Sequence, residues 1–168
     1  MTAFDQALMR ANRLAIVAML AAMALMVFAN VALRYTTGQS ILWAEEASRY
    51  LMIWLTFIGA GPVLRYGAHI GIDTLQERFP RQAPFIRATI VALLLVFFVV
   101  MTWLGVRYAM LTWAQTTPVL ELPVGAVYLA MPIGFALLAL HLLLMAHGYI
   151  VRHEHLSDAH FDSEAARL

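Results

Sequence analysis

The sequence predicts an all-α integral membrane protein with four transmembrane helices and an outer-face amphipathic interfacial helix before the second span. Of its 168 residues, 62% are hydrophobic and 12% are charged, and the mean hydropathy of +0.76 lies far outside the usage of soluble domains. A transmembrane helix needs roughly 20 apolar residues, and the apolar runs provide for four. We therefore expect one membrane domain over residues 1–150, a polar tail over 151–168, and no soluble enzyme domain.

The first span is expected over residues 14–33, where the run is uncharged and Asn30 is the one strongly polar side chain. Arg10 and Arg13 precede this run, as basic residues do in a secretory signal peptide. The run is longer than the roughly 7–15 apolar residues of a signal peptide, however. The sequence therefore favours an anchor that is retained.

A dense group of charged and aromatic residues lies directly ahead of the second span. Glu45 and Arg49 are separated by four residues, with the acid first, which is the favoured order for a pair on a helix surface. Trp43 and Tyr50 are of the aromatic types that settle at the headgroup level of a membrane. The pattern predicts a helix in the outer membrane surface, either separate or joined to the second span as one long tilted helix.

The charges in this group leave two interpretations open. An exposed helix pair that only anchors the helix contributes a few tenths of a kcal/mol. Yet one glutamate is enough to balance Arg49, so Glu46 remains at the hydrocarbon edge and needs a polar partner. Arg34, just past the first span, is the nearest candidate within the chain, and a second membrane subunit is the other. We favour a contact with a partner.

The other three spans are expected over residues 47–64, 88–106 and 124–146. Helix bends arise mainly at proline and at small residues. Gly59, Gly61 and Pro62 should therefore bend the second span, and Pro132 and Gly134 should interrupt the fourth.

Arginine predicts the orientation, because cytoplasmic flanks carry the excess of basic residues and the chain contains no lysine. In a four-span layout eight arginines fall on one side and three on the other, so both termini should be cytoplasmic. The larger set is Arg10, Arg13, Arg65, Arg78, Arg81, Arg87, Arg152 and Arg167; the smaller is Arg34, Arg49 and Arg107. The residues around Glu45 and the connection over 116–123 then share the outer face.

No catalytic or ion-translocating constellation is evident in the sequence. The expected spans contain no charged side chain deep in the membrane, where an ion relay would need one. Their polar groups Asn30, Thr56, Thr102 and His141 suit hydrogen bonding between helices. No Ser-His-acid set or phosphate-binding loop can be assembled, so we expect no enzyme activity. The net charge of +1 indicates no nucleic-acid partner.

Cofactor and metal sites are also not expected. The chain has no cysteine, which excludes thiolate metal sites and iron–sulfur ligation. His141 and His147 point about 240° apart on one helix, so they cannot bind one haem together. His69 with Asp73, and the tail histidines, lack the supporting residues of a metal shell; the latter are His153, His155 and His160.

The order and spacing of several motifs resemble the small membrane subunit (DctQ type) of tripartite ATP-independent periplasmic (TRAP) transporters. The resemblance covers most of the chain and excludes the tail. It rests on NVALRY at 30–35, WAEEASRY at 43–50, WLTFIGA at 54–60, HIGID at 69–73 and PVLELPVG at 118–125, followed by Tyr128 and Pro132. No single motif is decisive, but together they coincide with the four-span layout.

The resemblance implies an accessory subunit in the bacterial inner membrane that works with a large membrane subunit and a periplasmic solute-binding protein. The large subunit would hold the substrate and sodium sites, and the small one would widen its static scaffold. The substrate would be an organic acid. Two alternatives remain: a haem-binding anchor of a respiratory enzyme, and a small oligomeric exporter, which would need a membrane-embedded glutamate that the expected spans lack.

Overall fold

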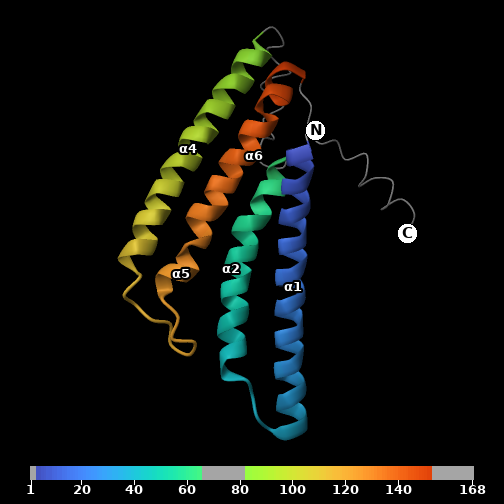
Figure 1. The fold of residues 1–168 in the computed structure, drawn as a ribbon, viewed down its shortest axis with the longest axis vertical. Coiled ribbons are helices and arrows are strands. Elements are labelled where there is room, and N and C mark those ends of the chain that lie inside the picture. Colours follow the sequence, from blue (N-terminus) through green and yellow to red (C-terminus); the bar gives the residue numbers. More distant parts are fainter. Residues whose placement is uncertain (1–2, 66–81, 153–168) are drawn as a thin grey trace, which may run out of the picture.

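The computed structural model describes residues 3–65 and 82–152, and this part of the chain is built from helices (Figure 1). The helices are α1 (Ala3–Thr37), α2 (Leu42–Arg65), α4 (Ala83–Leu111), α5 (Val124–Tyr128) and α6 (Ala130–Arg152). Four stretches are long and apolar enough to cross a membrane, over Phe4–Thr37, Leu42–Arg65, Ala83–Leu111 and Val124–Ala146. The predicted all-α membrane fold with four spans is therefore confirmed. The segment with His69 and Asp73, and residues 153–168 of the predicted tail, lie outside the described residues.

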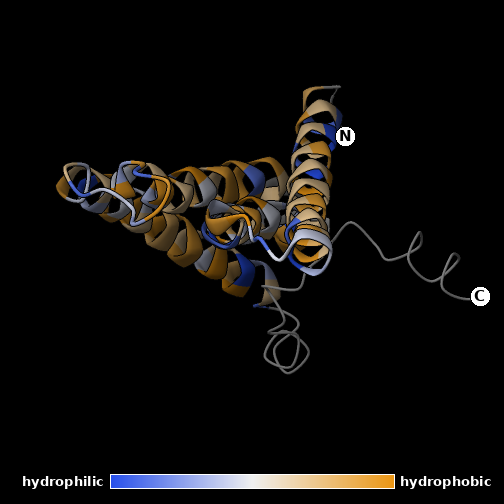
Figure 2. Cartoon of the chain, turned by 90° about the horizontal axis from the view of Figure 1, so that it is seen from below, coloured by the Kyte–Doolittle hydropathy of each residue, from blue (hydrophilic) through white to orange (hydrophobic). Residues whose placement is uncertain are grey.

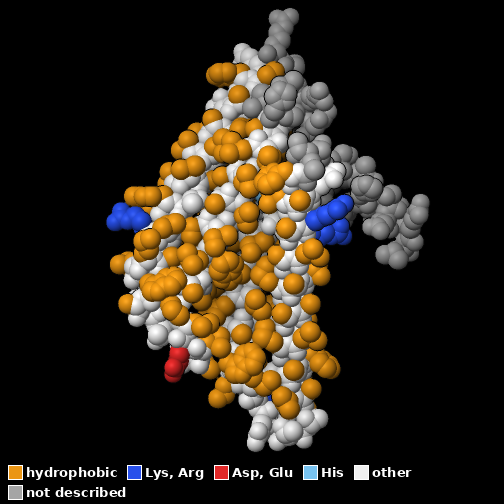
Figure 3. Space-filling view, in the orientation of Figure 1, with side chains coloured by type: hydrophobic (Ala, Val, Ile, Leu, Met, Phe, Trp, Pro, Cys, Tyr) orange, Lys and Arg blue, Asp and Glu red, His pale blue; other side chains and the backbone are white. Residues whose placement is uncertain are grey.

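The four long helices lie side by side as a single layer in the order α1, α2, α6, α4 (Figure 1). Helix α1 packs on α2, α2 packs on α6, and α6 packs on α4. Helices α1 and α4 therefore occupy opposite edges. A layer of this kind leaves large parts of its helices uncovered by the chain itself. Figure 2 shows that hydrophobic residues predominate along the helices, and Figure 3 shows apolar side chains spread over the visible surface of the spans.

The predicted interfacial helix and the second span form one continuous helix. Helix α2 begins at Leu42, contains Glu45 and Glu46 in its first turns, and runs through Pro62 to Arg65. The short connection from α1 is held by Asn30, whose side-chain oxygen accepts a hydrogen bond from the Ile41 backbone N–H at 2.6 Å. Gly38 in this connection has φ of +71°, a left-handed conformation that glycine adopts without a steric cost.

Glycines set the close approach of α6 to its two neighbours. A Cβ atom added to Gly134 would lie 2.6 Å from the Cβ atom of Phe57 on α2. A Cβ atom added to Gly105 of α4 would lie 2.9 Å from Cδ of Pro132 on α6. Small residues that let backbones approach are the usual means of helix packing in a membrane.

The fourth span is divided between α5 and α6, with the break at Leu129. Pro132 lies in the first turn of α6, and it has no N–H to donate to the carbonyl of Tyr128. The regular helical hydrogen bonding is therefore weakened in the turn before the proline. The Leu129 and Ile133 backbone N–H groups still bond four residues back, at 3.0 and 3.2 Å, so the two helices follow each other closely.

Candidate functional site

Asp5, Asn12, Arg65 and His141 form a buried polar cluster, here called the Arg65 cluster, where α1, α2 and α6 meet. Arg65 forms an ion pair with Asp5, and its Nε donates a hydrogen bond to His141 Nδ1 at 2.8 Å. The Asn12 side-chain amide lies 3.0 Å from His141 Nε2. All four residues are buried. The cluster thus joins the N-terminal end of α1 to the C-terminal end of α2 and to the middle of α6.

The hydrogen bonds determine the form of His141. Because Arg65 Nε–H can only donate, Nδ1 of His141 must be an acceptor, and the proton of a neutral ring is then on Nε2. The consistent partner for that N–H is the amide oxygen of Asn12, since amide oxygen and nitrogen exchange places by a flip. Both ring nitrogens of His141 are therefore engaged within the chain. A haem iron or another metal would have to displace Arg65 or Asn12 to reach this ring.

The sequence predicts that His141 forms hydrogen bonds between helices. It does not identify Asp5, Asn12 or Arg65 as members of the same polar cluster. Asp5 and Asn12 are seven residues apart and thus share a face of α1, which was the available signal. Gly61 provides the space for the ring, because a Cβ atom there would lie 2.5 Å from His141 Cδ2. The Arg65 cluster therefore connects α1, α2 and α6, and its one positive charge is balanced by its one negative charge.

Glu46 is the centre of a second polar site, here called the Glu46 cap, at the other end of α2. One carboxylate oxygen accepts a hydrogen bond from the Tyr50 hydroxyl at 2.6 Å. The other accepts from the backbone N–H groups of Val119 at 2.8 Å and Leu120 at 3.2 Å. The Glu46 side chain therefore fixes the connection between α4 and α5 to α2, and the α4–α5 connection replaces Arg34 as the partner of this carboxylate.

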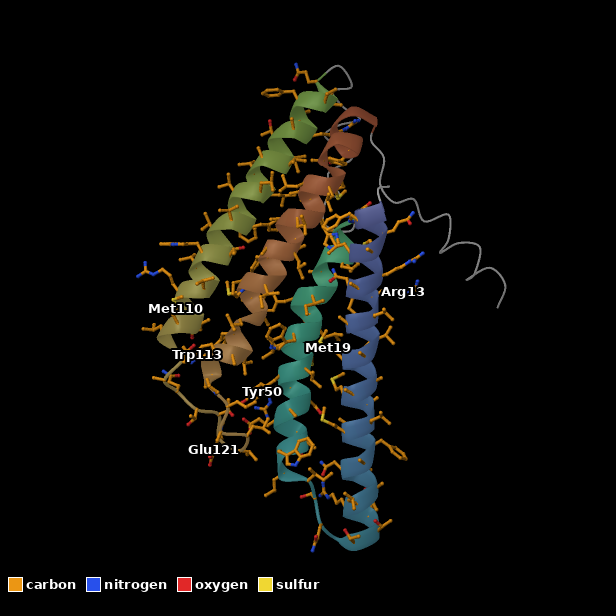
Figure 4. The ribbon with its side chains drawn as sticks, in the orientation of Figure 1. Arg13, Met19, Tyr50, Met110, Trp113 and Glu121 are labelled. Atoms are coloured by element: carbon orange, nitrogen blue, oxygen red, sulfur yellow. The ribbon has the colours of Figure 1, made fainter. Side chains whose placement is uncertain are left out.

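The α4–α5 connection is ordered by its own hydrogen bonds as well. The Thr117 backbone N–H donates to the Leu122 carbonyl at 2.9 Å, and the Thr117 hydroxyl accepts from the Leu122 N–H at 3.1 Å. Glu121 at the tip has φ of +52°, and its exposed side chain points away from the helices (Figure 4).

The remaining charges that the sequence singled out are exposed. Glu45, Arg49 and Arg34 all lie on the surface. Within the described part of the chain, the ion pair is that of Arg65 with Asp5, so Glu45 and Arg49 are not bridged to each other. Trp43, at the start of α2, is 46% exposed, as an aromatic residue at a membrane surface would be.

No group of three histidine, cysteine or acidic side chains in residues 3–65 and 82–152 lies close enough together to hold a metal ion. The buried acidic side chains of this region, Asp5 and Glu46, are both bound by other parts of the chain.

A protein-family model described as "Tripartite ATP-independent periplasmic transporters, DctQ component" matches residues 23–149. The C4-dicarboxylate TRAP transporter small permease protein DctQ of Rhodobacter capsulatus is 36% identical over 121 residues, which are 68% of this chain and 53% of that protein. The ectoine TRAP transporter small permease protein TeaB of Halomonas elongata is 29% identical over 123 residues, covering 70% of this chain and 63% of that protein. The isethionate TRAP transporter permease protein DctMQ of Oleidesulfovibrio alaskensis is 27% identical over 143 residues, covering 83% of this chain and 22% of that protein. The matched part is therefore about half to two thirds of the two small permease proteins and about a fifth of the third.

Proposed function

The chain belongs to the DctQ family of tripartite ATP-independent periplasmic transporter components, and we propose that it is the small accessory permease subunit of such a transporter. The proposal of an accessory role rests mainly on one observation. Each buried charged side chain in the described residues, namely Asp5, Glu46 and Arg65, is bound by another part of the same chain. Substrate and coupling-ion sites at membrane depth require polar groups that face a cavity, and in this proposal the large subunit provides them.

The proposed complex contains a large membrane subunit and a periplasmic solute-binding protein besides this chain. In it, sodium drives uptake of an organic acid that the binding protein delivers. The relatives named for C4-dicarboxylate and ectoine support a small charged organic solute as the substrate. The DctMQ relative supports the large partner, because the matched segment occupies 22% of a longer permease protein.

We place the chain in a bacterial inner membrane with both termini in the cytoplasm. The eight-to-three division of arginines supports this orientation. It puts the Glu46 cap and the α4–α5 connection on the outer side, and the Arg65 cluster toward the cytoplasm. Arg107 lies over the Trp103 ring at 5.1 Å, a basic and aromatic pair suited to the outer membrane surface.

Fusion reporters test this orientation. We expect reporters placed after Arg10, near Arg78 and after Arg152 to report cytoplasm, and reporters near Gly38 and Val119 to report the outer side. The reason is that basic flanks are retained in the cytoplasm during insertion. A periplasmic signal at any of the first three positions would overturn the topology.

Co-purification tests the accessory role. Affinity-tagged chain, extracted from membranes of its host in a mild detergent, should bring down a larger multi-span permease in a fixed molar ratio. A tagged unrelated four-span protein, expressed at the same level, is the control for adventitious capture. Recovery of the chain alone, or only with copies of itself, would contradict the proposal.

A further inference from the structure

One face of α2 remains open to the surroundings along the whole helix. It comprises Glu45, Arg49, Met52, Thr56, Gly59 and Val63, here called the α2 stripe. At 100° per residue these positions fall within an arc of about 80°. Met52 and Val63 are 53% and 43% exposed, Glu45, Arg49 and Thr56 are exposed, and Gly59 is partly exposed.

The neighbouring face of α2 is occupied by the chain itself. Phe57 contacts Phe135 of α6 edge to face at 5.8 Å between ring centroids, and Gly61 lies against His141. Glu46 on the same side binds the α4–α5 connection. The α2 stripe therefore lies to one side of the α2–α6 contact and belongs to an inner helix of the layer.

The α2 stripe is poorly suited to face lipid tails. The most apolar stretch of α2 is markedly less apolar than those of α1 and α4. The stripe begins with two charged residues, Glu45 and Arg49, that are not bridged to each other, whereas the Thr56 hydroxyl donates to the Met52 carbonyl of its own helix at 2.9 Å. Charged side chains that face out of a membrane helix call for a polar partner, and Gly59 allows a helix backbone to approach closely.

We propose that the α2 stripe is the surface on which a transmembrane helix of the large permease subunit packs. That helix would pack against Gly59 and Thr56, and at its outer end it would place groups complementary to Glu45 and Arg49. The inference rests on the proposed function and adds the contact surface to it. The DctMQ relative favours this occupant over a second copy, because there the matched segment is continuous in one polypeptide with a much longer permease.

Site-directed crosslinking tests the surface directly, because the chain contains no native cysteine. Met52→Cys and Val63→Cys place a thiol in the stripe. Leu93→Cys and Val96→Cys, at α4 positions that are 66% and 62% exposed, are the matched controls. Each variant is labelled with a maleimide photo-crosslinker after co-expression with the large subunit of its own transporter.

We expect stripe variants to give an adduct of the chain with the large permease, at least fivefold more abundant than from the α4 controls. Equal yields at the four positions, or higher yields from α4, would overturn the assignment. An adduct of twice the mass of the chain from the stripe positions would identify a second copy as the occupant and would also overturn it.

A bulk substitution provides the second test. A Cβ atom at Gly59 would meet only Ile16 Cδ1, at 3.9 Å, so Gly59→Leu should insert and fold. Ala92→Leu, at an exposed position of α4, adds comparable bulk as the control. We expect Gly59→Leu to lower recovery of the permease at least tenfold while Ala92→Leu retains it; normal recovery with Gly59→Leu would contradict the proposal. If the unmodified chain recovers no permease, the proposed function itself fails.

Discussion

Replacing Arg65 by methionine should destabilise the folded chain by about 3–5 kcal/mol, the cost of removing one member of a buried ion pair. The guanidinium neutralises Asp5 and donates to His141, and all three residues are buried. Its loss leaves the carboxylate without that cation and His141 Nδ1 without its donor. Unfolding of the purified protein in mixed micelles, followed by tryptophan fluorescence against denaturing detergent, measures the change.

The double variant Asp5→Leu with Arg65→Met is the matched control. Apolar replacement of both members of a buried pair is often neutral or stabilising, so the double variant should recover most of the lost stability. Arg10→Met, at an exposed position of α1, should have little effect. An Arg65→Met variant that unfolds at the same detergent fraction as the parent protein would contradict the clamp between α1, α2 and α6.

Replacing Glu46 by alanine should release the α4–α5 connection from α2. The change removes the acceptor for the Val119 and Leu120 backbone N–H groups and for the Tyr50 hydroxyl. Amide hydrogen exchange at Val119 and Leu120 should accelerate about tenfold or more, because both groups lose their bonding partner.

Glu45 offers an adjacent control for this variant. It has the same side chain, lies one position away and is exposed, so Glu45→Ala should leave exchange in the α4–α5 connection unchanged. Glu46→Gln retains an acceptor oxygen and should give an intermediate rate. Equal acceleration by Glu45→Ala and Glu46→Ala would show that the effect arises from local charge and not from the Glu46 cap.

The number of spans could be predicted because each span needs a long apolar run, and such a run consists of consecutive residues that are visible in the sequence. The bounds could not, since backbone hydrogen bonding continues beyond the hydrocarbon. Helix α1 thus extends from Ala3 to Thr37, well past the uncharged run at 14–33. The continuity of α2 with its charged first turns was one of two arrangements that the sequence left open.

The polar contacts of Glu46 and Arg65 could not be predicted, because they join residues that are far apart in the sequence and close only in the folded chain. The local rule favours Glu45 with Arg49, four residues apart. In the structure Glu46 instead binds backbone groups 73 and 74 residues away, because a buried carboxylate is best satisfied by several converging N–H donors. Arg65 and His141, 76 residues apart, lie on helices whose adjacency follows from the layer order and not from either helix alone.

Uptake by sealed vesicles tests most directly whether this chain is an accessory subunit. Vesicles would contain the chain alone, its large permease partner alone, or both, with the cognate binding protein, labelled substrate and an inward sodium gradient. We predict sodium-dependent uptake only when both membrane subunits are present, since the buried charges of the described chain are engaged in its own structure. Sodium-dependent uptake by vesicles that hold this chain without the large permease would contradict the account.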